Sequence, residues 1–254
     1  MHDVRTPILG PVLGRTLEHR AVDLTEIMDD PACDPAALDR TYRYFRPINA
    51  VVSGWRRVYV RHLRPHLSVH EPTTLLDIGS GGGDVPRALA RWAARDGLRL
   101  AVTAVDPDER AHRYVTAQPA TPGVEFRQAS SGDLVRDGET FDLVTSNHLL
   151  HHLDPDTLAS LLAHSAVLAR RLVVHADIER GRLAYAAYAA ATWPLARRSF
   201  VYDDGLASVR RSYRPHELAA VVPPGWDVRT QLPYRLLLVR DVTDATAREE
   251  ARHA

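Results

Sequence analysis

The sequence predicts an α/β fold with a mostly parallel β-sheet, and three features lead to this prediction. Residues 74–79 form an apolar run that enters a glycine-rich turn, and residues 84–95 then follow a helical pattern. Short apolar runs continue to alternate with helical stretches, which favours parallel pairing because each helix returns the chain to the same edge of the sheet. Residues 226–231 and 234–239 read as two closely joined strands, which predicts an antiparallel pair near the end of the sheet.

The first regular element is a helix that begins at Pro35. Asp34 is a favourable N-cap, and proline is favoured at the first helical position. Apolar and aromatic residues recur at three- and four-residue spacing, so the pattern is helical from about residue 17 to residue 66. We therefore expect residues 1–70 to form a helical cover outside the sheet, with residues 1–14 loosely held.

The later elements follow from periodicity and from helix start and stop signals. We expect strands at 74–79, 99–106, 124–128, 141–145, 172–175, 226–231 and 234–239, and helices at 84–95, 108–117, 155–168, 183–191 and 215–222. Asp203–Gly205 reads as a turn. These elements predict a core over residues 71–242, interrupted by an insertion at about 178–212 that is suited to a substrate lid, and a frayed tail over residues 243–254.

Composition narrows the class of protein. The chain has 254 residues with 32 Lys+Arg and 32 Asp+Glu, so no overall positive field points to a nucleic-acid partner. The single cysteine, Cys33, excludes an internal disulfide and offers no metal-binding pattern. Because no apolar run approaches the length of a membrane helix and no signal-peptide core is found, we expect a cytoplasmic protein without membrane contact. The sequence leaves open whether it is a monomer or a homodimer.

The glycine-rich turn does not fit the dinucleotide fingerprint. A G-x-G-x-x-G pattern that starts at Gly79 needs a glycine at its sixth position, where Asp84 stands. A carboxylate is electrostatically unfavourable where a pyrophosphate meets a helix N-terminus. The turn instead reads as acid-x-Gly-x-Gly-x-Gly from Asp77 to Gly83, followed by a strand that ends in a second acid, Asp106.

In these two motifs the chain resembles the class I S-adenosylmethionine (SAM)-dependent methyltransferases. The resemblance implies a Rossmann-like, seven-stranded, mostly parallel sheet with an antiparallel last strand and an N-terminal helical cover. It also implies that the glycine turn passes beside the methionine part of SAM and that Asp106 holds the ribose hydroxyls. The chemistry agrees, because a ribose diol offers two donors to one carboxylate and a cationic sulfonium tolerates nearby acids.

The resemblance assigns cofactor contacts along the carboxyl ends of the strands. The expected SAM-binding residues are Asp77, Gly79, Gly81, Asp106, Pro107, Ser131, Asp133 and Asn147. Many relatives contact adenine through an aspartate early in the turn after the third strand, where this chain has Ser130 and Ser131. The adenine contact is therefore either Ser131, through its backbone or hydroxyl, or Asp133 through its side chain. S-adenosylhomocysteine (SAH) would be the product.

Three histidines follow the fourth strand and are candidates for acid–base chemistry. His148, His151 and His152 would share one face if residues 148–152 were helical. They lie at the carboxyl edge of the predicted sheet, where open α/β sheets bind ligands. Methyl transfer to a hydroxyl requires removal of a proton, so we interpret His151 or His148 as a general base and His152 as a substrate contact. The alternative is that these histidines only cap the turn or fill space.

A second candidate pair ends the fifth strand. Strand alternation puts His175 and Asp177 on the same side, as expected for a base and the acid that orients it. Both residues could equally well form hydrogen bonds with backbone groups of the loop instead. Asp177 and, from the helical cover, Tyr42 and Tyr44 are further candidates for substrate contact, although that cover could also serve packing alone. Because no histidines and acids have the spacing of a metal site, we predict no metal.

The acceptor is predicted from proton affinity. A phenol has a pKa of about 10 and a free histidine about 6.5, a gap of roughly 5 kcal/mol, whereas an aliphatic alcohol is much harder to deprotonate. The segments Asp77–Asp84, Asn147–Leu153 and Ser208–Leu218 also resemble the bacterial methyltransferases that tailor quinones and polyketides. The hypothesis is O-methylation of a small phenol or quinol in secondary metabolism. The alternatives are C- or N-methylation on the same scaffold, or SAM binding without transfer.

Overall fold

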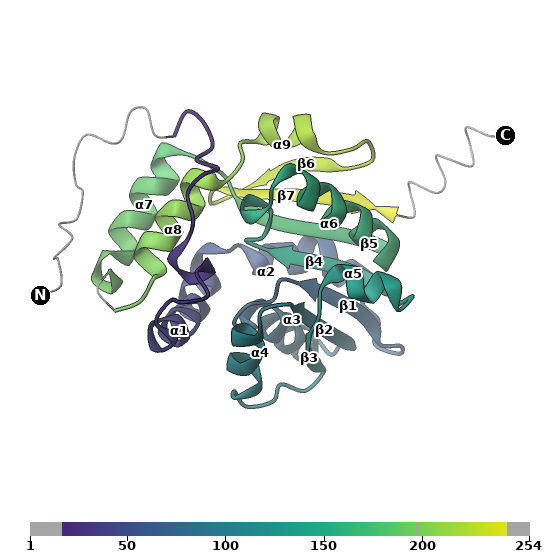
Figure 1. Cartoon of the computed structure of the whole chain (residues 1–254). Coiled ribbons are helices and arrows are strands. Elements are labelled where there is room, and N and C mark those ends of the chain that lie inside the picture. The colour runs from purple at the N-terminus through teal and green to yellow at the C-terminus, as the bar shows by residue number, and fades with distance from the viewer. Residues whose placement is uncertain (1–16, 197, 243–254) are drawn as a thin grey trace, which may run out of the picture.

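The protein forms one seven-stranded sheet with helices on both faces (Figure 1). The computed structural model describes residues 17–196 and 198–242, so the predictions for residues 1–14 and 243–254 lie outside the described residues. The strands are β1 (Thr73–Ile78), β2 (Leu100–Asp106), β3 (Val124–Gln128), β4 (Phe141–Asn147), β5 (Ala169–Ile178), β6 (Asp227–Gln231) and β7 (Arg235–Asp241). Their order in the sheet is β3-β2-β1-β4-β5-β7-β6, and only β7 runs antiparallel to its neighbours. The predicted fold class is confirmed.

Helices and short turns connect these strands. The α-helices are α1 (Pro35–Val52), α2 (Trp55–Val58), α3 (Asp84–Arg95), α4 (Glu109–Thr116), α5 (Ser131–Arg136), α6 (Pro155–Leu168), α7 (Arg182–Thr192), α8 (Val201–Arg211) and α9 (Pro215–Val221). The short turns are η1 (Ile27–Asp29), the π-helical η2 (Tyr59–Leu63), η3 (Arg64–His66), η4 (Leu150–His152) and η5 (Trp193–Leu195). In Figure 1, α1, α7 and α8 gather at one end of the sheet. Within the described residues, no helix is both long and apolar enough to span a lipid bilayer.

The sheet is buried on both faces because each central strand carries consecutive apolar residues in its middle. Alternate residues of one strand enter different cores: Leu76 packs into the core on one face and Leu75 into the core on the other. Val173 and Val174 on β5 divide in the same way. A buried sheet of this kind holds the ends of its strands in fixed positions.

Register brings the carboxyl ends of the central strands to one edge. Ile78 at the end of β1 pairs with Val105 on β2 and with Ser146 on β4. Asn147, the last residue of β4, pairs with Ala176 on β5. The residues that follow these strands therefore meet at the same edge, as expected for a ligand site in an open α/β sheet.

The predicted turn at Asp203–Gly205 is wrong, because these residues lie inside α8. The two aspartates occupy the first turn of the helix, where the helix dipole favours acids. Gly205 serves close packing: a Cβ there would overlap the ring of Tyr188 on α7. The glycine thus lets α7 and α8 approach each other.

The predicted helical pattern for residues 17–66 holds only in part. Helix α1 begins at Pro35, with the backbone N–H of Ala36 bonded to the Asp34 side chain at 3.0 Å. Residues 17–34 instead form an irregular segment with one short 3₁₀ turn, η1. The fifth strand is longer than expected, since β5 covers residues 169–178.

Candidate functional site

The glycine turn after β1 has a backbone that favours glycine. Gly79, Gly81 and Gly83 have φ angles of +69°, +49° and +71°, in the left-handed region that side chains disfavour. A Cβ at Gly83 would also lie 2.6 Å from the Phe126 ring. The positive φ angles and, at Gly83, the close contact with Phe126 therefore favour glycine at these motif positions.

Asp106, at the end of β2, bonds to the glycine turn. One carboxylate oxygen accepts the N–H of Gly81 at 2.8 Å, and the other accepts the N–H of Asp108 at 2.9 Å. Burial raises the pKa of Asp106, whereas these two backbone donors lower it, with a net rise. Each oxygen retains a further lone pair. Asp106 can therefore still accept two hydroxyl groups from a diol.

Two more acids lie at the turn, Asp77 buried and Asp84 half-buried. Burial raises the pKa of Asp77 to about 7, although the Thr145 hydroxyl donates to its carboxylate at 2.8 Å. Asp84 begins α3 and accepts a hydrogen bond from the Asn49 side chain at 2.9 Å; burial raises its pKa. Acids at this turn suit a cationic ligand and oppose a pyrophosphate, so the chemistry of these groups fits SAM.

Tyr42 on α1 covers the glycine turn. Its side chain is buried, and a Cβ added to Gly82 would lie 3.1 Å from it. Its ring centroid lies 5.0 Å from that of Tyr114 on α4. Burial and the nearby Asp106 carboxylate raise the pKa of Tyr42 well above its usual value. Tyr44, on the same helix, is half-buried. The substrate contacts predicted for the two tyrosines remain predictions, and Tyr42 itself lies at the cofactor turn.

The two residues considered for adenine have local partners at the start of α5. The Ser131 hydroxyl lies 3.0 Å from Nδ1 of His164. The Asp133 carboxylate accepts the N–H and the hydroxyl of Ser130, both at 2.7 Å, in a capping box. It also pairs with Arg136. Because capping engages the Asp133 carboxylate, this geometry favours Ser131 of the two alternatives. Pro107 follows Asp106, and its carbonyl lies 3.4 Å from the Gln128 amide.

The segment after β4 does not form the helix that would have aligned three histidines. His148 has a φ of +55°, and only residues 150–152 form a 3₁₀ turn, η4. The rings of His151 and His152 lie 4.2 Å apart, whereas those of His148 and His151 lie 6.4 Å apart. The prediction that all three histidines share one face is therefore wrong: the rings of His151 and His152 are adjacent, and His148 lies apart from them.

His148 belongs to a different set of contacts. Its Nε2 lies against the guanidinium of Arg235, which also donates to the Asn147 side chain at 2.7 Å. Burial, followed by the charge of Arg235, lowers the pKa of His148 well below its usual value. His148 is therefore a neutral imidazole that accepts from Arg235. Asn147, predicted as a cofactor contact, is held in place by the same arginine.

His151 is held by the carboxylate of Asp177. Its Nδ1 lies 2.7 Å from one carboxylate oxygen, and its backbone N–H donates to the other at 2.9 Å. Its Nε2 lies 3.4 Å from Oε1 of Glu26. Burial lowers the pKa of His151, but the two carboxylates outweigh burial and raise it to about 9. The structure thus gives His151 the orienting acid expected for a base.

The predicted pair of His175 and Asp177 is not formed. Nδ1 of His175 lies 2.8 Å from the Ser146 hydroxyl, and its ring stacks on Trp226 with centroids 5.5 Å apart. Burial lowers its pKa to about 3. Positions two apart on a strand are separated by about 7 Å, and Asp177 instead reaches the η4 turn beyond the end of β4. This environment makes His175 a core residue.

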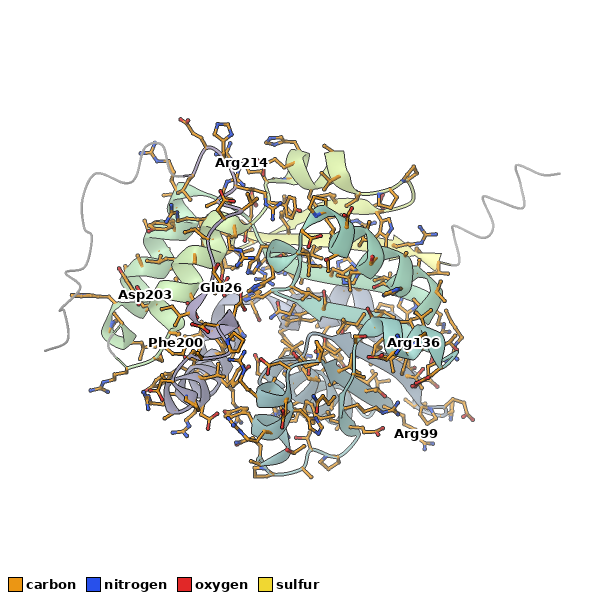
Figure 2. The ribbon with its side chains drawn as sticks, in the orientation of Figure 1. Glu26, Arg99, Arg136, Phe200, Asp203 and Arg214 are labelled. Carbon is orange, nitrogen blue, oxygen red and sulfur yellow. The ribbon has the colours of Figure 1, made fainter. Side chains whose placement is uncertain are left out.

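Three residues of this site were missed by the sequence analysis: Glu26, Asp29 and Arg235. Glu26 is buried, and its carboxylate accepts the Ser208 hydroxyl at 2.7 Å (Figure 2). Figure 2 shows it on the N-terminal segment between α8 and the sheet. Asp29 lies 3.2 Å from Nδ1 of His152 and 3.5 Å from Arg211. Only Arg235 carried a signal, as a cation at the start of the apolar strand Arg235–Asp241.

Comparison with known proteins agrees with the fold and the glycine turn. Residues 75–171 match a family model described as a methyltransferase domain. The ubiquinone biosynthesis O-methyltransferase of Caulobacter vibrioides is 33% identical over 106 residues, 39% of this chain and 40% of that protein. The protein of the same name from Paramagnetospirillum magneticum is 31% identical over 134 residues, 50% of this chain and 49% of that protein. The chain thus spans half or less of the length of these curated relatives.

Solved structures show the same fold at low sequence identity. The plantazolicin methyltransferase BpumL, crystallised with a triazolic desmethylPZN analogue and SAH, has a TM-score of 0.57 at 11% identity, covering 85% of this chain and 92% of that chain. Human N-acetylserotonin methyltransferase, crystallised with SAM, also has a TM-score of 0.57 at 11% identity, covering 82% of this chain and 56% of that chain.

The sheet order and the acid-flanked glycine turn define a class I methyltransferase fold with a SAM-type site. The methyltransferase-domain match over residues 75–171 covers less than half of the chain, and within that range it agrees with this fold.

Proposed function

We propose that this protein transfers the methyl group of SAM to an oxygen atom of a small aromatic acceptor, a phenol or quinol. The observation that carries the proposal is the buried pair of Asp177 and His151 at the carboxyl edge of the sheet. Leu149, two residues before His151, contacts the glycine turn, since a Cβ at Gly79 would lie 3.3 Å from the Leu149 side chain. This contact supports a base on the segment that packs against the cofactor turn.

The residues for the cofactor follow from the glycine turn and its acids. SAM, when bound, supplies a methyl group on a cationic sulfur. Asp106 would accept the ribose diol, and the backbone at Gly79 and Gly81 leaves room for the methionine part. Ser131 and Asn147 are the proposed further contacts. The same acids, with Asp77 and Asp84, favour a cationic ligand over a dinucleotide.

In this proposal the neutral form of His151, whose share grows as pH rises toward its pKa of about 9, accepts the proton of the acceptor hydroxyl at Nε2. Asp177 holds the proton of the other ring nitrogen on Nδ1 and fixes the ring orientation. Glu26, whose Oε1 lies 3.4 Å from Nε2, would remain ionised and stabilise the imidazolium that results. A phenolic hydroxyl, with a pKa of about 10, suits an imidazole base far better than an aliphatic alcohol. The O-methyltransferase names of the curated relatives support oxygen as the acceptor atom.

The test is to incubate untagged protein with SAM and matched acceptors: a phenol, a hydroquinone, an aniline and an aliphatic alcohol. SAH formation gives the rate, and mass spectrometry with NMR locates the methyl group. We expect O-methylation of the phenol or hydroquinone. Methyl on carbon or nitrogen would replace this proposal with a C- or N-methyltransferase, and SAH binding without any transfer would leave a SAM-binding protein.

The role of His151 has its own prediction. His151→Gln should lower kcat by about 100-fold or more, because general-base assistance is worth about 10²–10⁴, while SAH affinity changes less than about twofold. His216→Gln on α9 is the control, since His216 is exposed and outside the site. Equal losses of kcat and SAH affinity would make His151 structural.

A further inference from the structure

We infer that Glu26, His151 and His152 form a binding site for a divalent transition-metal ion, with zinc as the best-fitting ion. The three residues each offer one ligand atom, and these atoms lie within 4.8 Å of one another. Two imidazoles and a carboxylate are ligands that zinc prefers. The sequence analysis predicted no metal because Glu26, in the N-terminal segment, is far in sequence from the two histidines.

The distances between the candidate ligand atoms suit a metal. Oε1 of Glu26 lies 3.4 Å from Nε2 of His151 and 3.6 Å from Nε2 of His152. Ligand atoms about 2.0–2.2 Å from a tetrahedral zinc ion lie roughly 3.3–3.6 Å from each other. The carboxylate oxygen therefore already lies at the spacing from each imidazole nitrogen that one ion requires, and all three ligand atoms lie within 4.8 Å of one another.

The far nitrogen of each histidine is held by a carboxylate. Nδ1 of His151 lies 2.7 Å from Asp177, and Nδ1 of His152 lies 3.2 Å from Asp29. Metal-bound histidines usually donate their other ring N–H to such a group, which fixes the ring and presents the remaining nitrogen to the ion. Both histidines thus present Nε2 to the same oxygen of Glu26.

An unsatisfied polar atom points into this site. Nε2 of His151 is fully buried and has no hydrogen bond of acceptable geometry among residues 17–196 and 198–242. Buried polar atoms normally have a partner, so a missing one suggests an absent ligand. The His152 side chain is 23% exposed, which gives an ion access from solvent.

Three protein ligands leave a fourth position open, as in catalytic rather than structural zinc sites. A hydroxyl bound there would have a lowered pKa. This consequence, unlike the binding site itself, rests on the proposed function. In the metal-bound protein His151 would serve as a ligand, and the ion would replace it in activating the acceptor hydroxyl.

The test uses untagged protein that has been treated with a chelator and dialysed. Zn²⁺ is titrated by calorimetry, Co²⁺ by its visible absorption, and Mg²⁺ serves as a hard-ion control. We expect one Zn²⁺ per chain and strong absorption typical of tetrahedral Co²⁺. Glu26→Gln and His152→Gln should each weaken Zn²⁺ binding by about 10-fold or more. His19→Gln, an exposed histidine on the same N-terminal segment as Glu26, should leave it unchanged.

The inference would be overturned if the native protein did not bind Zn²⁺. It would also be overturned if both ligand variants bound Zn²⁺ as tightly as the native protein. His152→Gln is the informative variant because its side chain is partly exposed, and circular dichroism with SAH binding confirms that it folds. Binding is measured without SAM or acceptor, so it is independent of the methyl-transfer assay. Zn²⁺ binding without methyl transfer would refute only the proposed function, and transfer by protein that cannot bind Zn²⁺ would refute only the metal site.

Discussion

At the scale of single residues, the partner of each histidine decides what it can do. His151 and His175 are both fully buried, but their surroundings move their pKa values in opposite directions. Asp177 and Glu26 surround His151, whereas a serine hydroxyl and an indole ring surround His175. Burial alone therefore does not identify a functional histidine; the neighbouring charges do.

His175 makes stability depend on pH in acid solution. Its folded pKa of about 3 lies below the unfolded value of about 6.5, so between these values the unfolded chain binds more protons. Stability is then lost as pH falls through this window, by at most about 1.4 kcal/mol per pH unit. His175→Phe, which preserves stacking on Trp226, should flatten this slope.

Urea unfolding at several values between about pH 4 and pH 7 measures that effect as the difference between variant and native protein. His112→Gln on α4 is a control whose slope should match the native one. A slope that is the same for His175→Phe and native protein would contradict the prediction. Because His175 lies in the core and not beside the glycine turn, methyl transfer at neutral pH should be retained.

At the scale of elements, the N-terminal segment is bonded to α8 through Asp204, in addition to the bond between Glu26 and Ser208. The Asp204 carboxylate accepts the backbone N–H groups of Ile27 and Met28 at 2.7 and 3.0 Å. These are the first residues of η1, directly after Glu26. Helix α8 thereby holds Glu26 over the histidines of η4.

Asp204→Ala should release this segment. Burial raises the pKa of Asp204 to about 7, so at about pH 8 the carboxylate is ionised and its two hydrogen bonds are charge-assisted. Their loss should cost about 2–3 kcal/mol of unfolding free energy and expose residues near η1 to protease. Asp203→Ala is the matched control, because Asp203 precedes Asp204 on α8 and is exposed.

Urea unfolding and limited proteolysis, followed by mass spectrometry of the fragments, test the segment directly. If Asp204→Ala and Asp203→Ala behaved alike, the contact would not hold the segment.

The sequence predicted most elements because the signals for strands and helices are local. The run that includes Leu75 and Leu76, the glycine turn and the proline helix starts all depend on neighbouring residues. Residues 17–34 were predicted to be helical but form an irregular segment, so neither the position of Glu26 nor its contact with His151 was predicted. Gly205 was misread as part of a turn because its role depends on Tyr188 of another helix.

At the scale of the whole molecule, distant segments meet at one edge of the sheet. The glycine turn, Asp106, Asn147 and Asp177 come from four parallel strands, and register brings their ends together. Helix α1 adds Tyr42, and the N-terminal segment adds Glu26. Sequence analysis could predict which strand ends carry the site, but not which covering residues complete it.

Because the cofactor site joins several strands and α1, ligand binding should stabilise the whole fold. SAH at about 100 times its Kd should add about 2.7 kcal/mol to the unfolding free energy, if it binds only folded protein. For a chain of this size that corresponds to a rise in Tm of roughly 5–10 °C. NAD should produce no shift, because acids surround the turn where a pyrophosphate would lie.

Asp106→Ala tests whether the proposed ribose contact contributes to the stabilisation by SAH. The variant should lose about 1–3 kcal/mol of SAH affinity, through the lost carboxylate and its bond to the Gly81 N–H. At the same SAH concentration its Tm shift should be markedly smaller than that of native protein. Asp156→Asn on α6, which is exposed, should retain the full shift. If all three proteins showed equal Tm shifts and equal SAH affinity by calorimetry, Asp106 would not contact the ligand. The reason is that a ligand can stabilise the fold only through contacts that it makes.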